Sequence, residues 1–378
     1  MTRRSRGVVG AHPVPLFLYT DATAFGGAEI ALLMLLERLD RRRFAPTLVY
    51  HSAHGVVTLA RRAQELGADL LDVPPLPLGL TGARRAPALS RLLRRSGAVV
   101  FHAHLSSPVA AKWALAAAAS ARVRRVIATV QLVPPASFDV STRLQLRLLA
   151  AAVDRYITVS AHIGHELERA LRIPASKVVV IPNGVDLSRF PPAARSNPTR
   201  VTGEPQTVLT VARLHEQKGL EVVVHAAREL PGVRFLIAGE GPERPSLERL
   251  TRSLGVEERV VLLGHRDDIT ALLGDADLFV LPSRYEGFPL ALLEAMASGV
   301  AVVASDIPGI TELVTDDSRG LLVAPGDVSG FTRAIGELLG HDARRAALGR
   351  AARQLVEERY DADELARRVV AQYDVARP

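Results

Sequence analysis

The sequence contains no cysteine, and only 4% of its 378 residues are aromatic. The absence of cysteine excludes disulfide bonds and thiolate chemistry. Hydrophobic residues nevertheless make up 48% of the chain, which indicates a globular protein with a core rich in alanine, valine and leucine. Because 378 residues exceed the usual size of one hydrophobic core, the length predicts two domains.

Long apolar runs are also missing. No segment approaches the roughly 20 apolar residues that a transmembrane helix needs. The charged start, Met1–Arg6, resembles a secretory signal, but the apolar segment behind it, Val14–Tyr19, is too short for one and predicts a strand. The alanine-rich segment Trp113–Ala121 lies between Lys112 and Arg122, and it predicts a packed helix. These absences agree with a cytoplasmic protein, and the cytoplasm is the location that we expect.

Lysine is scarce as well. The chain has three lysines, Lys112, Lys177 and Lys218, so its formal charge of +7 comes almost entirely from arginine. These arginines alternate with acidic residues through most of the sequence. Neither a zinc-ligand spacing nor an RNA-binding aromatic signature accompanies them, and we therefore expect no nucleic-acid partner.

One predicted helix carries arginine without acidic residues. Its apolar side is formed by Leu89, Leu92 and Leu93. The basic residues around them are Arg84, Arg85, Arg91, Arg94 and Arg95. Two interpretations stay open: a peripheral contact with anionic membrane, at the inner face, or a helix that covers the core and turns a solvated arginine face outward.

Short apolar runs alternate with helical periodicity along both halves of the chain, which predicts parallel sheets covered by helices. A proline-rich segment interrupts the alternation. We predict an α/β protein of two Rossmann-like, doubly wound domains that face a central cleft. The expected limits are 1–188 for the first domain, 189–205 for a linker, 206–360 for the second domain and 361–378 for a C-terminal helix.

The expected elements can be stated residue by residue. The helices predicted in the first half are Gly27–Leu39, near Thr58–Leu66, near Ala86–Arg95, from Val109 onward and near Thr142–Ala152. The expected strands are Val14–Tyr19, Pro46–Tyr50, Leu70–Val73, Ala98–His102, Val126–Val130, Tyr156–Val159, Val208–Val211, Arg234–Ala238, Val260–Leu263, Leu278–Leu281, Ala301–Ala304 and Gly320–Val323.

Two glutamates carry the strongest functional signal. Glu294 follows Glu286 by eight positions, and Pro289 between them is favoured at the first position of a helix. Glu286 then lies on a turn after a strand, and Glu294 lies in the second turn of the helix. Backbone N–H groups at such a turn bind anions, and carboxylates accept hydrogen bonds from sugar hydroxyls. The pattern predicts a nucleotide-sugar site.

The spacing of Glu286 and Glu294 resembles the EX7E motif of retaining glycosyltransferases of family 4, which have the GT-B fold. Three other segments match that family: Gly26–Glu29, Val180–Asp186 and Val211–Gly219. The four motifs occur in the family's order and spread over most of the chain. The resemblance implies acceptor binding by the first domain, donor binding by the second, and a C-terminal helix that packs back towards the first domain.

The resemblance also implies roles for matched residues. Arg213 and Lys218 are expected to hold the donor's pyrophosphate and to offset the charge that grows on the leaving nucleotide. Glu286 is expected to orient the transferred sugar, and Glu294 to accept hydrogen bonds from the ribose hydroxyls.

Backbone N–H groups are expected to meet phosphate at two places. Gly26 and Gly27 follow the first strand, where glycine allows a close approach of the backbone. The second place is the start of the helix after Glu286, and its residues are Gly287, Phe288, Pro289 and Leu290.

The chain departs from the family pattern at Gln131. The family usually carries a histidine at the end of this strand, where it contacts the donor sugar. A glutamine can bind a hydroxyl group but cannot carry a proton at neutral pH. We expect Gln131 to serve as a positional replacement for that histidine.

Two pairs of residues imitate metal sites. His102 and His104 lie two positions apart on a strand, and Asp275 and Asp277 form an Asp-Ala-Asp sequence. Neither pair has a further ligand at a compatible spacing, and Asp277 adjoins a buried strand. We expect no metal at either pair, a structural or acceptor-lining role for the two histidines, and structural roles for the two aspartates.

The sequence therefore predicts a retaining, metal-independent hexosyltransferase that has no cofactor. Its donor is expected to be a UDP-sugar in preference to a GDP-sugar. The acceptor stays open among an envelope glycan, a lipid-linked intermediate and a small metabolite. Two alternatives are a non-catalytic nucleotide-sugar-binding protein and a dinucleotide-dependent oxidoreductase, the latter suggested by Gly239 and Gly241 after a strand.

Overall fold

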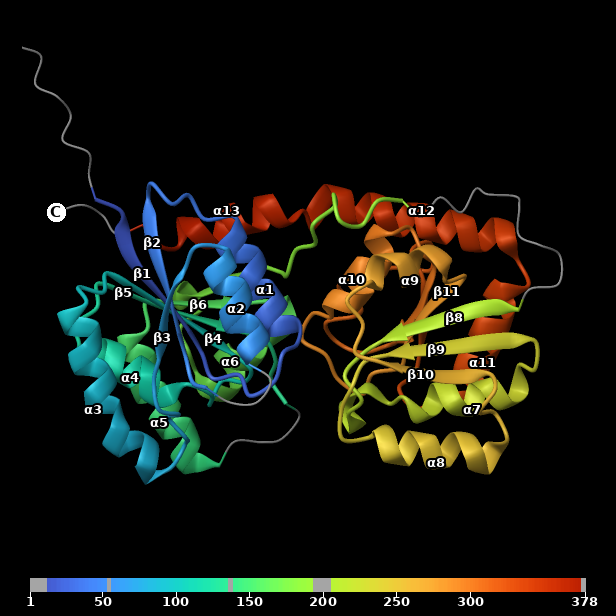
Figure 1. Ribbon diagram of the computed structural model, residues 1–378, viewed down its shortest axis with the longest axis horizontal. Coiled ribbons are helices and arrows are strands. Elements are labelled where there is room, and N and C mark those ends of the chain that lie inside the picture. Colours follow the sequence, from blue (N-terminus) through green and yellow to red (C-terminus); the bar gives the residue numbers. More distant parts are fainter. Residues whose placement is uncertain (1–11, 53–55, 135–138, 193–204, 375–378) are drawn as a thin grey trace, which may run out of the picture. The chain divides into compact units, whose positions relative to one another are not determined.

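The computed structural model describes residues 12–52, 56–134, 139–192 and 205–374 (Figure 1). These residues form two compact units. The first takes its residues from Met1–Thr129, Val140–Ile157 and Val369–Pro378, and the second from Val130–Asp139 and Thr158–Arg368. The predicted domain limits remain a prediction, and most of the predicted linker, 193–204, lies outside the described residues.

The N-terminal half of the chain builds a seven-stranded sheet in the order β3-β2-β1-β4-β5-β6-β7. Strand β1 pairs in parallel with both β2 and β4, so the strand order reverses at β1. All six residues of β4 are buried, as expected for a strand covered on both faces. The strands are β1 Val14–Thr20, β2 Phe44–Tyr50, β3 Asp69–Asp72, β4 Val100–Leu105, β5 Arg125–Val130, β6 Arg155–Thr158 and β7 Val178–Val180.

Helices cover both faces of this sheet. Helices α1 and α2 contact one another, and α4 lies between α3 and α5 (Figure 1). Because parallel crossovers are right-handed, the reversal of strand order at β1 places α1 and α2 on one face and α3, α4 and α5 on the other. The helices are α1 Gly27–Glu37, α2 Val57–Glu65, α3 Leu80–Arg95, α4 Lys112–Ser120, α5 Val140–Ala152 and α6 Ala161–Leu171.

The C-terminal half builds a six-stranded sheet in the order β10-β9-β8-β11-β12-β13. Its order reverses between β8 and β11, and Phe235, Val280 and Phe331 are fully buried in the core around it. The strands are β8 Gln206–Val211, β9 Val233–Ala238, β10 Val260–Gly264, β11 Leu278–Leu281, β12 Val302–Ser305 and β13 Leu321–Val323. The helices are α7 Glu221–Glu229, α8 Arg244–Leu254, α9 Ile269–Asp275, α10 Leu290–Ala297, α11 Val328–Leu339, α12 Asp342–Arg359 and α13 Ala362–Ala371.

The predicted fold class is confirmed, because both sheets are parallel and covered by helices, and every predicted strand is present. The sequence did not predict β7 or α6. Three predicted helix starts are wrong. Helix α4 begins at Lys112 and not at Val109. Helix α3 begins at Leu80 and holds Pro87 in its interior, and α10 begins at Leu290, because Pro289 has an extended ψ of 112°.

Among the described residues, the helices lack the combination of length and apolar composition that crossing a membrane requires.

Candidate active site

Two loops of the second unit meet where the order of its sheet reverses. One follows β8 and leads to α7, and the other follows β11 and leads to α10. Loops at such a point leave the carboxyl edge of the sheet in opposite directions, which makes this edge the usual ligand site of doubly wound sheets. The loops carry Arg213, Lys218 and Glu286, three of the predicted site residues.

The structure brings Lys218 and Glu286 into direct contact. The Nζ atom of Lys218 lies 2.5 Å from Oε1 of Glu286, and the hydroxyl of Ser283 donates to the same oxygen at 2.7 Å. The Glu286 side chain is only 7% exposed, so its charge is largely removed from water. A buried carboxylate of this kind needs its counter-charge, and the pair therefore fixes the distance between the two loops.

Gln217, which the sequence analysis missed, joins the same two loops. Its side-chain N–H donates to the backbone carbonyl of Tyr285 at 2.9 Å. Its backbone carbonyl accepts from the backbone N–H of Arg284 at 2.7 Å. Next to it, Gly219 has a φ of +58°, and a Cβ atom there would lie 2.4 Å from the carbonyl oxygen of Pro282. No sequence signal distinguishes Gln217, because its role appears only once the two loops are adjacent.

Gly239 and Gly241, which follow β9, pack against the loop that follows β8. Their φ values are +145° and +159°, and a Cβ atom on either would come within 2.2 Å of the carbonyl oxygen of Ala212 or Leu214. These glycines are therefore needed for loop packing. This packing explains the glycine pattern without a dinucleotide.

Arg213 projects from the loop that these glycines support. It is exposed, and it makes no hydrogen bond or ion pair with any described residue. An arginine held only by its backbone is available to an anionic ligand, to which it can donate a pair of hydrogen bonds.

The start of α10 offers further donors. The N–H groups of Gly287, Phe288 and Leu290 make no hydrogen bond within the described chain, whereas Pro289 has no N–H group and cannot take the predicted phosphate-binding role. The side chains of Phe288, Pro289 and Leu290 are buried, so this segment can offer a ligand only its backbone. Free N–H groups at a helix start attract anions.

Glu294 lies in the second turn of α10, as predicted. Burial raises the pKa of its carboxyl from the ordinary 4.5 to about 7, although the nearby Arg189 lowers it in part. A carboxyl whose pKa is raised by burial is costly to keep ionised, and such groups concentrate at functional sites.

Gln131 and Asn183 form a reciprocal amide pair. Nδ2 of Asn183 lies 3.1 Å from Oε1 of Gln131 and 3.3 Å from the carbonyl oxygen of Phe288. A Cβ atom on Gly287 would lie 1.8 Å from the carbonyl oxygen of Gln131, so only glycine fits there. Gln131 is thereby packed against the start of α10, and Asn183 of the matched segment Val180–Asp186 supplies its partner.

The remaining predicted glycines lie in the first unit. Helix α1 begins at Gly27, and the N–H group of Gly26 donates to the Glu29 carboxylate at 2.9 Å. This N–H group is therefore engaged by a carboxylate in the structure, and its role towards a phosphate stays a prediction.

His102 is held by two hydroxyl groups, whereas both ring nitrogens of His104 are buried without a hydrogen-bond partner among the described residues. The ring nitrogens of His102 lie 2.7 Å from the hydroxyls of Tyr373 and Thr129, and the ring of His104 stacks 4.3 Å away. Burial lowers the pKa of both imidazoles, to about 4 for His104. In the described part of the chain, no group of three or more His, Cys, Asp or Glu side chains is arranged to hold a metal.

Asp277 is also structural, because its carboxylate accepts a hydrogen bond from the N–H of Thr207 at 2.8 Å.

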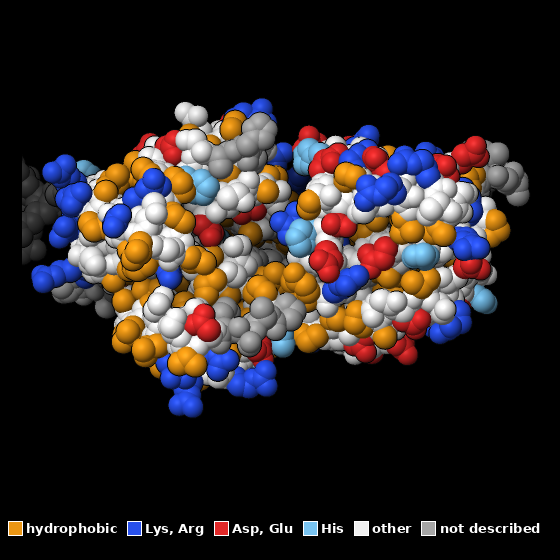
Figure 2. Space-filling model, turned by 90° about the horizontal axis from the view of Figure 1, so that it is seen from below, with side chains coloured by type: hydrophobic (Ala, Val, Ile, Leu, Met, Phe, Trp, Pro, Cys, Tyr) orange, Lys and Arg blue, Asp and Glu red, His pale blue; other side chains and the backbone are white. Residues whose placement is uncertain are grey.

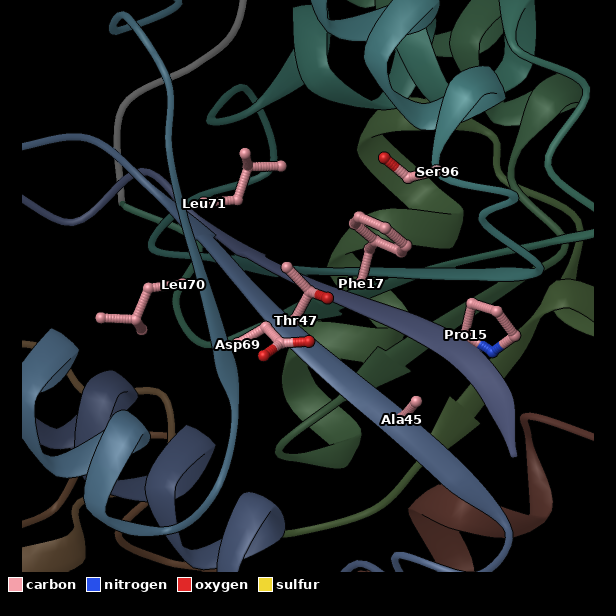
Figure 3. Close-up of a pocket in the computed structure, with 8 residues that line it drawn as sticks. All are labelled: Pro15, Phe17, Ala45, Thr47, Asp69, Leu70, Leu71 and Ser96. Carbon is pink, nitrogen blue, oxygen red and sulfur yellow. The ribbon is translucent and has the colours of Figure 1, made fainter. Parts of the chain in front are cut away.

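A surface pocket of about 330 Å³ lies over β1, β2 and β3 (Figure 3). None of the predicted site residues lines this pocket. Its lining residues are Pro15, Phe17, Ala45, Thr47, Asp69, Leu70, Leu71 and Ser96.

Comparison with known proteins decides the family. The sequence model described as Glycosyltransferase Family 4 matches residues 25–189, and the one described as Glycosyl transferases group 1 matches residues 194–355. The two matches adjoin and together include every predicted site residue. The chain belongs to glycosyltransferase family 4. The predicted family is confirmed.

Curated relatives of this family 4 chain match over part of their length. A glycogen synthase of Mycobacterium tuberculosis is 36% identical over 214 residues, which are 55% of this chain and 51% of the relative. A D-inositol 3-phosphate glycosyltransferase of Nocardia farcinica is 34% identical over 227 residues, 56% of this chain and 50% of the relative. The chain spans about half the length of the curated relatives it matches.

The solved structure of Anabaena HepE in complex with UDP-glucose has the same fold. It superimposes with a TM-score of 0.81, covers 94% of this chain and 98% of its own, and is 20% identical. The GT-B fold of the family 4 chain is thus supported over nearly its full length.

The packing of the β8 loop can be tested with two glycines of similar conformation. Gly219 and Gly255 have φ values of +58° and +65°, but a Cβ atom on Gly255 would meet nothing within 4 Å. We expect Gly255→Ala to lower the free energy of unfolding by about 1 kcal/mol, the cost of the left-handed backbone. Gly219→Ala should lose about 1–3 kcal/mol more through the clash with Pro282. Equal losses in urea unfolding would contradict the interlocking of the loops.

The raised pKa of Glu294 predicts a pH-dependent stability. The folded protein binds the carboxyl proton more tightly than the unfolded chain does, so the free energy of unfolding falls as pH rises from about 4.5 through about 7. We expect Glu294→Gln to raise the melting temperature at pH 8 and to change it little near pH 5. Glu358→Gln, at an exposed position of α12, should leave both unchanged. A Glu294→Gln effect that is equal at both pH values would show that the carboxyl titrates normally.

Proposed function

We propose that this chain transfers a hexose-type residue from a UDP-sugar to an acceptor with retention of the anomeric configuration. One observation supports this most: the buried Lys218–Glu286 pair lies on the two loops at the sheet reversal, with the unpaired Arg213 on one of them. Cations and a carboxylate are thus available for a diphosphate and for sugar hydroxyls respectively. Membership in family 4 agrees with this assignment.

Each group has a role in the proposed complex. Arg213 and Lys218 bind the diphosphate, together with the N–H groups at the start of α10. When Lys218 turns part of its charge to the phosphate, Glu286 is released to accept hydrogen bonds from the sugar. Glu294, ionised, accepts hydrogen bonds from the ribose hydroxyls, because a desolvated carboxylate is a strong acceptor.

The proposed reaction is a front-side substitution. The bond between the anomeric carbon and the UDP oxygen breaks, and the acceptor oxygen forms its bond on the same face while its proton passes to the leaving phosphate. Negative charge grows on UDP as the bond breaks, so Arg213 and Lys218 stabilise the transition state more than the ground state. No side chain forms a covalent intermediate.

UDP is the nucleotide that we propose. HepE, which shares the fold, has been solved with UDP-glucose, but its 20% identity does not extend its ligand to this chain. The acceptor classes remain an envelope glycan, a lipid-linked intermediate and a small metabolite, and a cytoplasmic location stays a prediction. The oxidoreductase alternative is withdrawn, because Gly239 and Gly241 have a packing role and the chain belongs to family 4.

The test is incubation with radiolabelled UDP-hexoses and GDP-hexoses, with and without a panel of acceptors, in EDTA and in excess magnesium. We expect transfer or slow hydrolysis of a UDP-hexose that EDTA leaves unchanged. Binding without turnover would favour the alternative of a nucleotide-sugar-binding protein. Loss of activity in EDTA would contradict the metal-independent mechanism, and preference for GDP-hexoses would contradict the assigned nucleotide.

Substitutions at Arg213 and Lys218 separate catalysis from stability. Arg213→Ala should lower kcat about a hundredfold or more and leave the melting temperature unchanged, since Arg213 is exposed and makes no hydrogen bond or ion pair with a described residue. Arg228→Ala, at an exposed site on α7, is the matched control. Unchanged kcat in Arg213→Ala would remove this residue from the site.

Lys218→Ala should lose activity and also stability, up to about 3–5 kcal/mol, because Glu286 keeps a buried charge without its partner. Adding Glu286→Gln to Lys218→Ala should restore the melting temperature but not turnover. Turnover that returns together with stability would assign Lys218 a structural role only.

The amide pair predicts a positional role for Gln131. Gln131→His should keep activity within about tenfold, whereas Gln131→Ala should lose more, because the side-chain oxygen of Asn183 loses its partner at a cost of about 1–3 kcal/mol. Gln131→Ala combined with Asn183→Ala should cost less than the sum of the two single substitutions. Additive losses, or transfer that begins only in Gln131→His, would contradict the positional role and favour a binding protein.

A further inference from the structure

One face of the first sheet is strongly basic. Three of the four helices on that face, α3, α4 and α5, contain eight lysine and arginine residues and no aspartate or glutamate, whereas the fourth, α6, contains Glu166, Glu168 and Arg169. On the opposite face, α1 and α2 contain three glutamates and two arginines. Helices on both faces cover the same sheet, so the stability of the fold does not explain why the two sets of helices differ in charge. The basic residues are Arg84, Arg85, Arg91, Arg94, Arg95, Lys112, Arg143 and Arg147.

The same face exposes most of the large apolar side chains that the described chain leaves in solvent. Val140, Leu144 and Leu148 of α5 are 82%, 57% and 69% exposed, and Leu78 and Leu80 at the start of α3 are 50% and 77% exposed. The described chain has six exposed large hydrophobic residues, and these are five of them. Positions four apart lie on one side of a helix, so the α5 residues form a single apolar row.

Contacts through α4 join the two apolar groups into one surface, which we call the α3–α5 face. The indole N–H of Trp113 donates to the carbonyl of Leu78 at 3.0 Å, and the Lys112 ammonium donates to the side chain of Gln145 at 2.9 Å. A Cβ atom on Gly82 would lie 2.4 Å from Trp113, so α3 and α4 are closely packed. Figure 2, seen from the side on which α3 and α5 lie, shows hydrophobic side chains with Lys and Arg side chains around them over its left part.

We propose that the α3–α5 face binds the surface of an anionic lipid bilayer. The apolar row would insert at the boundary between headgroups and acyl chains, and the arginines would reach the lipid phosphates while their stems cover apolar surface. The combination of apolar residues with cations and the lack of acidic residues matches this boundary, which is apolar below and negatively charged above. A protein partner is an alternative outcome of the test.

This interaction does not depend on glycosyl transfer and can be measured without a donor. The sole tryptophan of the chain, Trp113, lies on the α3–α5 face and gives a signal without labelling. The protein is mixed with vesicles of phosphatidylcholine alone or with phosphatidylglycerol, some of them carrying brominated acyl chains. We expect sedimentation only with phosphatidylglycerol vesicles, weakening in high salt, and quenching of Trp113 by the brominated lipid.

Substitutions separate insertion from electrostatic attraction. Leu144→Ser with Leu148→Ser should weaken vesicle binding at least tenfold, because two leucines no longer enter the apolar layer. Val57→Ser, 70% exposed on α2, is the matched control and should change nothing. Reversal of the five α3 arginines to glutamate should abolish binding at an unchanged melting temperature, and Arg61→Glu on α2 should not.

Three outcomes would overturn the proposal. The first is a wild-type protein that ignores phosphatidylglycerol vesicles at low salt. The second is binding that the leucine substitutions leave intact without quenching of Trp113, which would indicate adhesion to any polyanion. The third is self-association in place of vesicle binding, which the leucine substitutions abolish and which would assign the face to a second copy of the chain.

Discussion

The ion pair between Lys218 and Glu286 is the constraint around which the site is built. A carboxylate that is only 7% exposed is stable when charge and hydrogen bonds compensate the loss of water, and here Lys218 and Ser283 both approach one oxygen. This requirement holds the loops after β8 and β11 at a fixed separation. Gly219 follows from it, because a Cβ atom there would meet the carbonyl oxygen of Pro282 and push the two loops apart.

Sequence patterns predicted the elements that this pair joins but not how they are joined. The strands were predictable because their buried residues form continuous apolar runs, and the glutamate spacing located the site. Gln217 and the pairing of Gln131 with Asn183 depend on contacts between segments distant in sequence, which no local pattern encodes. Strand β7 was not predicted although its three valines form an apolar run, and α3 begins at Leu80, before the predicted start at Ala86.

The site also carries groups that lower stability. Glu294 keeps a carboxyl with a pKa near 7, and burial makes its charged form costly at neutral pH. Asn183, which pairs with Gln131, donates to the carbonyl of Phe288 at the start of α10, where N–H groups have no acceptor among the described residues. N–H groups at a helix start and a desolvated carboxyl on the next turn are both suited to an anionic or polar ligand, which agrees with the proposed donor site.

The basic α3–α5 face needs a separate explanation, because the fold does not require it. Helices α1 and α2 cover the same sheet with mixed charge and one exposed large hydrophobic residue, Val57, whereas α3 to α5 combine eight cations with apolar side chains in solvent. Eight like charges on one face repel each other, and exposed leucines promote aggregation, so each feature alone lowers stability or solubility. A negatively charged bilayer relieves both at once, because its phosphates neutralise the arginines and its acyl boundary accepts the leucines. If the proposed transfer activity holds, this location would bring the enzyme to lipid-linked acceptors in preference to the other two classes.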